Sequence, residues 1–75
     1  MPRLRRLSGA AVCRILKAYG FQEVRRRGSN VVMQRVSKDG TLTVPVPDHA
    51  DLKPGTLSAI IRQSHLPRQA FEEEA

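Results

Sequence analysis

The stretch RRRGSNVVMQRVSKDGTLTVPV, residues 25–46, decides the fold because it alternates strand-like runs with two turns. Near its start, Gly28 and Ser29 form a turn signal between a strand of mixed polarity over residues 22–27 and a β-rich run over residues 31–36. This pattern predicts a hairpin whose turn directly follows three consecutive arginines.

A second turn lies further along the same stretch. Residues 37–40 read Ser-Lys-Asp-Gly, in which Asp-Gly favours a tight turn, and residues 41–46 alternate polar and apolar side chains. The alternation predicts a third strand. Pro45 and Pro47 have no backbone N–H to donate, so this strand must end near them or lie at an edge of the sheet.

Before the hairpins, the sequence predicts a helix that begins after Ser8 and ends near Gly20. Serine is a favourable N-cap, and glycine is common just beyond a helix C-terminus. Leu7 and Val12 have the spacing of a hydrophobic staple, which fixes how the chain enters the helix. The expected buried face has apolar residues at i, i+3, i+4 and i+7, namely Val12, Ile15, Leu16 and Tyr19.

After the third strand, the loop of residues 48–53 leads to a second predicted helix that starts near Pro54, because proline fits the first helical turn. Ser64 and His65 are expected to end this helix, and residues 67–71 to form a last short one. The apolar stripe of the second helix consists of Leu57, Ile60 and Ile61.

The 75 residues are expected to form a single domain, because a chain of this length cannot bury a second core. The order α-β-β-β-α predicts an α+β fold with a three-stranded antiparallel sheet, both main helices on one face and the other face open. Residues 1–7 would form a basic N-terminal arm, and residues 67–75 a helical turn with an acidic tail.

Alternation along the second strand assigns its side chains to the two faces of the sheet. If Val31 and Met33 face the helices, then Asn30, Val32 and Gln34 face the opposite way. Asn30 is therefore expected at the edge of the open face, beside the arginines.

The charge balance favours a polyanionic partner. Thirteen Lys and Arg against seven Asp and Glu give a net charge of +6, and three of the acids are consecutive, at residues 72–74. Most of the cations are arginine, which pairs bidentately with phosphate, so nucleic acid is the leading candidate. A solvated basic face, or a patch that docks an acidic protein, is the alternative.

Cys13 is the only cysteine, so no internal disulfide forms, and a lone thiol suits a reducing cytoplasm. Its place beside the apolar stripe of the first helix indicates a structural role. Neither a signal peptide nor a membrane-spanning segment is expected, because no long apolar run occurs. The scattered Cys13, His49 and His65 lack the spacing of a metal site.

Several short motifs, in their order and spacing, resemble the HicA toxin family of toxin–antitoxin systems, also called YcfA-like. The resemblance covers residues 8–66. The matching motifs are Gly20-Phe21, the basic run Arg25 to Ser29, Thr43-Val44-Pro45, Gly55-Thr56-Leu57 and Ile60 to Gln63.

This resemblance implies a fold like that of double-stranded-RNA-binding domains, used as an mRNA interferase. Such an enzyme is an endoribonuclease that acts on mRNA, needs no cofactor and is held inactive by a cognate HicB-like antitoxin. The family's catalytic residue is the histidine directly after Gly-Ser, and Asn30 occupies that position here.

The change from histidine to Asn30 alters the chemistry that the position supports. Imidazole exchanges protons near neutral pH, as cleavage through the RNA 2′-hydroxyl requires, whereas an amide only donates and accepts hydrogen bonds. Loss of one acid–base group typically removes about 10² to 10⁴ of rate. The hypothesis is that Asn30 marks a cleavage site that binds RNA and has lost most of its chemistry. The alternative is that Asn30 only tolerates the turn geometry.

Other residues are candidates for the same site. His49 is a possible second acid–base group, although a loop histidine is more often simply solvated, and His65 is expected to cap the second helix. Two of the three consecutive arginines should bind phosphate, with the third solvated or on the helix side. The full set of candidate RNA-binding residues is Arg25, Arg26, Arg27, Gly28, Ser29, Gln34, Arg35, Lys53 and Arg62.

Two further functions remain open from the sequence. One is a module that binds nucleic acid without cutting it, and the other is an interaction domain for an acidic partner. The open face has almost no aromatic residues on which bases would stack, so sequence-selective reading of RNA is expected to be weak.

Overall fold

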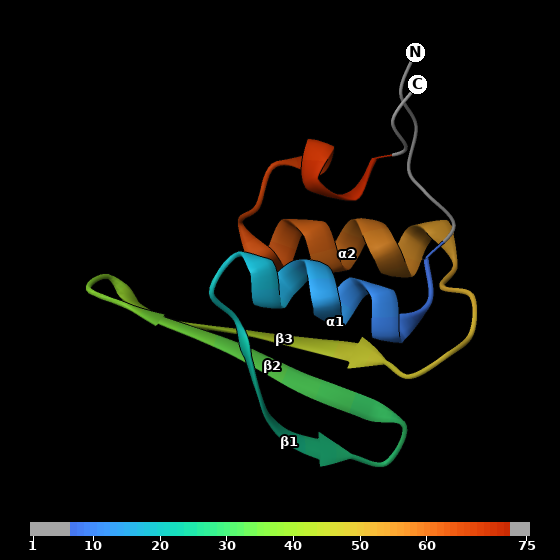
Figure 1. Cartoon of the computed structure of the whole chain (residues 1–75), viewed down its shortest axis with the longest axis horizontal. Coiled ribbons are helices and arrows are strands. Elements are labelled where there is room, and N and C mark those ends of the chain that lie inside the picture. The colour runs from blue at the N-terminus through green and yellow to red at the C-terminus, as the bar shows by residue number, and fades with distance from the viewer. Residues whose placement is uncertain (1–6, 73–75) are drawn as a thin grey trace.

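The computed structural model describes residues 7–72, and the predicted order of elements is confirmed (Figure 1). A three-stranded sheet lies below two helices, so the domain is a small α+β fold. The basic arm and acidic tail expected from the sequence lie largely outside the described residues. In chain order the elements are α1 (Gly9–Ala18), β1 (Gln22–Arg27), β2 (Asn30–Ser37), β3 (Gly40–Pro47), α2 (Pro54–Ser64) and the 3-10 helix η1 (Arg68–Phe71).

Helix α1 begins as the sequence predicts. The hydroxyl of Ser8 accepts a hydrogen bond from the Ala11 N–H at 3.1 Å, which satisfies one of the free donors of the first turn. Val12 and Leu16 are fully buried. The prediction that Tyr19 belongs to the buried stripe is wrong, since its side chain is 44% exposed. Tyr19 is the C-cap, where the backbone has left helical geometry and the 3.6-residue period no longer applies.

The entry to α1 is held close to the end of β3. The Gly9 N–H donates to the His49 carbonyl oxygen at 2.8 Å, and a Cβ at Gly9 would overlap the carbonyl oxygen of Pro47. Only glycine permits this approach, because every other residue carries a Cβ. Leu7 and Val12, the predicted staple, both belong to the same hydrophobic core.

Helix α2 has proline in its first turn and buries Leu57 and Ile60, as predicted. Its C-cap is His65, with a left-handed backbone at φ 58° whose N–H donates to the Arg62 carbonyl oxygen. The predicted capping position of His65 is therefore confirmed. None of the described helices is long and apolar enough to span a membrane.

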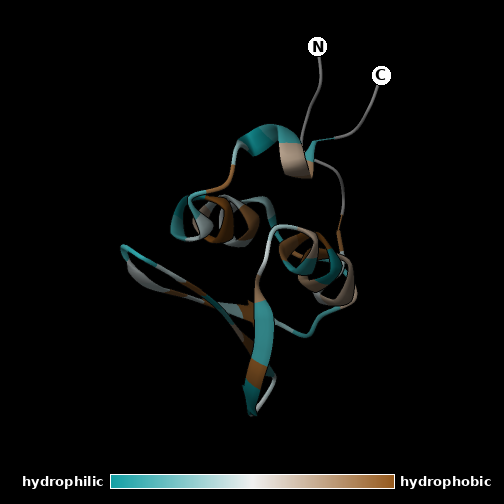
Figure 2. Cartoon of the chain, turned by 60° about the vertical axis from the view of Figure 1, so that its left-hand side comes forward, coloured by the Kyte–Doolittle hydropathy of each residue, from teal (hydrophilic) through white to brown (hydrophobic). Residues whose placement is uncertain are grey.

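The sheet has the order β1-β2-β3 with both pairs antiparallel. Strand β3 is an edge strand that stays paired through Pro45 and Pro47, so the nitrogen of each proline must point away from β2. In β1 the pairing is interrupted at Val24, which is an extra residue between Glu23 and Arg25. Val24 is also the one hydrophobic residue in an otherwise hydrophilic strand (Figure 2).

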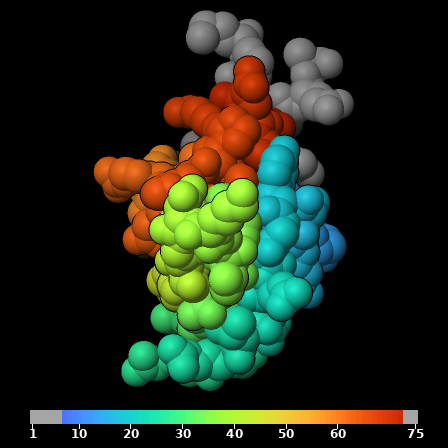
Figure 3. All heavy atoms as spheres, turned by 90° about the vertical axis from the view of Figure 1, so that its left-hand side faces the viewer, coloured from blue at the N-terminus to red at the C-terminus, as the bar shows by residue number. Residues whose placement is uncertain are grey.

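The core lies between the helices and one face of the sheet. Val31 and Met33 of β2 point into it, as the alternation predicts, together with Val44 and Val46 of β3. Of the aromatic residues, Phe21 and Phe71 are nearly or completely buried. The β2–β3 hairpin extends beyond the helices, and in Figure 3 its yellow-green atoms lie forward between α1 and the orange-to-red C-terminal part.

Candidate nucleic-acid interface

A hollow of about 590 Å³ lies on the face of the sheet opposite the helices, and we call it the cationic hollow. All three strands contribute to it. Val32 forms part of its lining and is only 6% exposed, because neighbouring side chains cover it. The lining residues are Arg25, Arg27, Gly28, Asn30, Val32, Thr43 and Pro45.

The bulge at Val24 decides which arginines reach this hollow. Strict alternation from Gln22 would turn Arg26 to the open face and its two neighbours toward the helices. The extra residue shifts the register, so that Arg25 pairs with Val32 and Arg27 with Asn30, both of which line the hollow. Two arginines of the three therefore lie on the open face.

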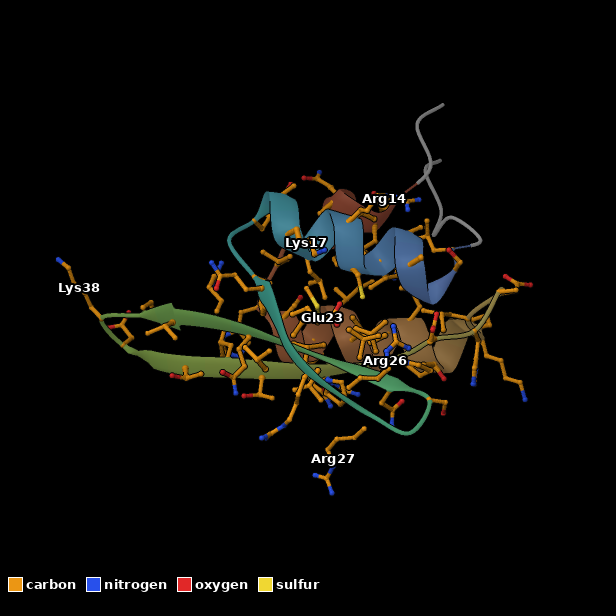
Figure 4. The ribbon with its side chains drawn as sticks, turned by 60° about the horizontal axis from the view of Figure 1, so that its bottom comes forward. Arg14, Lys17, Glu23, Arg26, Arg27 and Lys38 are labelled. Carbon is orange, nitrogen blue, oxygen red and sulfur yellow. The ribbon has the colours of Figure 1, made fainter. Side chains whose placement is uncertain are left out.

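Arg26 is on the other side of the strand, opposite the buried Val31. Its Nη1 donates to Asp48 Oδ2 at 2.7 Å, and this hydrogen bond and the carboxylate charge raise the pKa of Arg26 above its ordinary value. Figure 4 shows Arg27 extending away from the ribbon, with Arg26 on the side of the helices. Within residues 7–72, neither Arg25 nor Arg27 forms a salt bridge with a carboxylate.

Asn30 is the first residue of β2. It pairs with Arg27 of β1 on one side and with Pro47 of β3 on the other. The residue is exposed, and its side chain makes no hydrogen bond to any other described residue. The turn-geometry explanation for Asn30 is wrong. The left-handed residue of this turn is Gly28, at φ 58°, and in the described part of the chain His65 is the only non-glycine residue with positive φ.

A second hollow, of about 410 Å³, lies between the end of the sheet and α2. It also includes Asn30 and Pro45, so the two hollows adjoin. We call it the neutral hollow because none of the described residues that line it is charged. Its lining residues are Asn30, Pro45, Pro47, Gly55, Thr56, Ala59, Ile60 and Gln63.

Sequence reasoning pointed to the second helix only through Lys53 and Arg62, and missed the residues of α2 that line this hollow. Thr56, Ala59 and Gln63 follow one another at i, i+3 and i+7, which places them along one side of the helix. That spacing was visible in the sequence, next to the apolar stripe. The spacing alone does not show which surface these residues line, because that depends on how α2 packs against β3.

Arg35 does not lie with the other candidate residues. Its Nη1 donates to the Tyr19 carbonyl oxygen at 3.4 Å, and its guanidinium carbon is 5.2 Å from the centre of the Phe21 ring. It is thus on the helix side of the sheet, near the end of α1. The signal was in the sequence, because Arg35 follows the core residue Met33 by two positions.

The remaining candidates line neither hollow. Gln34 shares the face of Asn30, and its Nε2 donates to Thr43 Oγ1 at 3.3 Å. Ser29 accepts a hydrogen bond at its carbonyl oxygen from the Asp48 N–H at 2.7 Å, which ties the turn to the loop after β3. Lys53 caps α2 and Arg62 lies near the other end of that helix.

His49 is exposed and belongs to neither lining, although its carbonyl oxygen holds the start of α1. Cys13 is buried on α1, and burial, assisted by the charge of Glu23, raises the pKa of its thiol above its ordinary value. Among residues 7–72, no three His, Cys, Asp or Glu residues are grouped so as to hold a metal ion.

The fold and these two hollows define a small α+β domain with an arginine-lined open face and an uncharged neighbouring groove. The family model for the HicA toxin of bacterial toxin–antitoxin systems matches residues 9–66, which is most of the chain. The protein therefore belongs to the HicA toxin family. No curated protein matched the sequence.

Proposed function

We propose that this protein is an RNA-binding toxin of the endoribonuclease type whose cleavage chemistry is weakened because Asn30 replaces the family's histidine. The observation that carries the proposal is that Asn30 pairs with Arg27 and lines the cationic hollow together with Arg25 and Arg27, neither of which forms a salt bridge within residues 7–72. In this reading the substrate is mRNA.

The cationic hollow has the chemistry to hold an RNA phosphate. Guanidinium groups form bidentate hydrogen bonds with phosphate oxygens, and neither Arg25 nor Arg27 uses its charge on a carboxylate within residues 7–72. Arg26 is different, since Asp48 already neutralises it. Arg25 and Arg27 therefore provide phosphate contacts, while Arg26 fixes the loop after β3.

Asn30 lies where a phosphate held by these arginines presents its oxygens. Its amide donates and accepts hydrogen bonds, and it orients the bound strand. It does not take a proton from the 2′-hydroxyl or deliver one to the leaving oxygen, because an amide does not titrate near neutral pH. Binding is retained on this proposal and cleavage is slow.

The exposed arginine-lined face also suits an acidic protein partner. We propose that a HicB-like antitoxin covers this face and competes with RNA for it, since the same positive charges would serve both ligands. The protein would thus have two alternative ligands at one surface.

The proposal is tested by titrating a fluorescent single-stranded RNA at several salt concentrations. RNA binding through phosphates should weaken steeply with salt, because bound cations are released from the RNA, and the logarithm of affinity should fall linearly with the logarithm of salt concentration. Absence of any binding at about 50 mM salt would overturn the proposal and favour a domain that only docks an acidic protein.

A further inference from the structure

We propose that the neutral hollow between β3 and α2 is a nucleobase pocket, which takes one base of the RNA strand whose phosphate lies in the cationic hollow. This inference rests on the proposed RNA-binding function and adds the residues that contact a base. Gln63 is the residue assigned to read the edge of that base.

The two hollows differ in charge, as the phosphate and the base of a nucleotide do. The cationic hollow contains Arg25 and Arg27, which match a phosphate. The neutral hollow is lined only by uncharged side chains and backbone, which suits the uncharged ring of a base. Its volume, about 410 Å³, is within the usual range of small-ligand sites, roughly 300 to 1,000 Å³.

The lining of the neutral hollow also matches the surfaces of a base. A base has two apolar faces and a polar edge. Pro45 and Pro47 present apolar rings from the sheet, and Ala59 presents its methyl group from α2. The polar edge then meets the Gln63 amide, which offers two donors and one acceptor. Gln63 is exposed, and its side chain makes no hydrogen bond to another described residue.

Asn30 and Pro45 line both hollows, so the two sites adjoin at the position of the proposed chemistry. A phosphate in one hollow and a base in the other can therefore belong to the same or adjacent nucleotides. Such an arrangement would fix which nucleotide of the RNA lies beside Asn30.

The structure argues against a peptide strand as the occupant. Strand addition depends on main-chain hydrogen bonds to the free edge of a sheet. At this end of β3, Pro45 and Pro47 have no N–H, and their nitrogens are the groups that face away from β2. The edge thus lacks the donors that an added strand needs.

The test compares two RNA octamers that differ only in their bases, one with normal nucleotides and one with abasic ribose phosphates. The native protein should bind the base-containing octamer about tenfold more tightly, because a bound base adds hydrogen bonds and apolar contact. The variant Gln63→Ala should lower this ratio toward one and leave affinity for the abasic octamer unchanged.

Gln69→Ala is the matched control, since Gln69 is exposed on η1 and is not part of either hollow. It should preserve the ratio. Arg25→Gln with Arg27→Gln should instead weaken both octamers by a similar factor. Equal binding of the two octamers by the native protein, or a ratio that Gln63→Ala leaves unchanged, would overturn the base pocket while the proposed function stands.

Two other results have different meanings. If Gln63→Ala leaves both octamers unaffected but weakens binding of the antitoxin, the neutral hollow belongs to a protein interface and the inference is wrong. If the native protein binds neither octamer at low salt, the proposed RNA-binding function itself fails.

Discussion

Arg27 and Asn30 lie directly opposite each other across the β1–β2 hairpin, and the side chains of both line the same hollow. Gly28, the left-handed residue of the turn between them, allows this tight reversal. A guanidinium and an amide that have no competing partner among residues 7–72 are thereby presented together to solvent. The pairing explains how so small a sheet concentrates phosphate-binding groups at one point.

The double variant Arg25→Gln and Arg27→Gln should weaken RNA binding and reduce its salt dependence. Each phosphate contact to a single strand contributes about 0.7 to the slope of log affinity against log salt, so loss of two contacts should lower the slope by roughly 1.4. Fluorescence anisotropy titrations at several salt concentrations measure this change.

Its matched control is Arg14→Gln with Lys17→Gln, which removes the same charge from the exposed side of α1 (Figure 4). This variant lowers the overall positive field but removes no residue of the cationic hollow. Its salt slope should stay close to that of the native protein. Equal losses in the two double variants would mean that RNA binds the general field and not this hollow.

Substitution of Gly9 by alanine should strongly destabilise the fold. The added methyl group would overlap the Pro47 carbonyl oxygen, so α1 would have to move away from β3. We expect a loss of about 2 kcal/mol or more in the free energy of unfolding, as for overpacked sites. Urea denaturation measures it. Gly55→Ala, where the new Cβ would meet no atom within 4 Å beyond its chain neighbours and the backbone of its own helix, should be neutral or stabilising.

Cys13 should make stability depend on alkaline pH. Burial raises the pKa of its thiol in the folded state above its ordinary value, so the thiolate forms first in the unfolded chain. The protonated Cys13 thiol therefore contributes its full stability at pH values below its pKa in the unfolded chain. This stability is lost as the pH rises through its pKa in the folded protein. Denaturation at pH 7 and pH 10 should show a larger loss for the native protein than for Cys13→Ala. Equal losses in both proteins would assign the pH effect to other groups.

Replacing His65 by glycine should stabilise the protein. His65 ends α2 in a left-handed conformation, which costs a residue with a Cβ about 1 to 2 kcal/mol. Part of this gain is offset by the greater freedom of glycine in the unfolded chain, so a net increase of about 0.5 to 1 kcal/mol is expected. Thermal unfolding checks the change, and a lower melting temperature would contradict the assignment. RNA affinity should be unaffected, because His65 lines neither hollow.

The sequence predicted the fold well because local signals agreed with one another. Ser8, Pro54 and the two turns delimit the elements, and the alternation along β2 correctly separates Met33 from Asn30. The bulge at Val24 was not predictable. Residues 22–27 contain a single apolar side chain, so no hydrophobic pattern specifies how β1 aligns with its neighbour.

The site was predicted only in part for the same reason. Alternation identified the face of Asn30, but the arginines that accompany it depend on the bulge, and the neutral hollow depends on how α2 packs against β3. Arg35 lies on the helix side of the sheet and lines neither hollow, a placement that its spacing from Met33 indicated. Tertiary packing, which no single stretch encodes, decides the position of the bulge and the shape of the neutral hollow.

The most direct test of the central claim is RNA cleavage by Asn30→His, with Asn30→Gln as the control that keeps an amide. Restoring an imidazole in the cationic hollow should raise the cleavage rate by about 10² to 10⁴ while RNA affinity changes little. The glutamine variant should remain as slow as the native protein. An Asn30→His protein that binds RNA normally and cleaves it no faster would contradict the claim that Asn30 occupies a catalytic position.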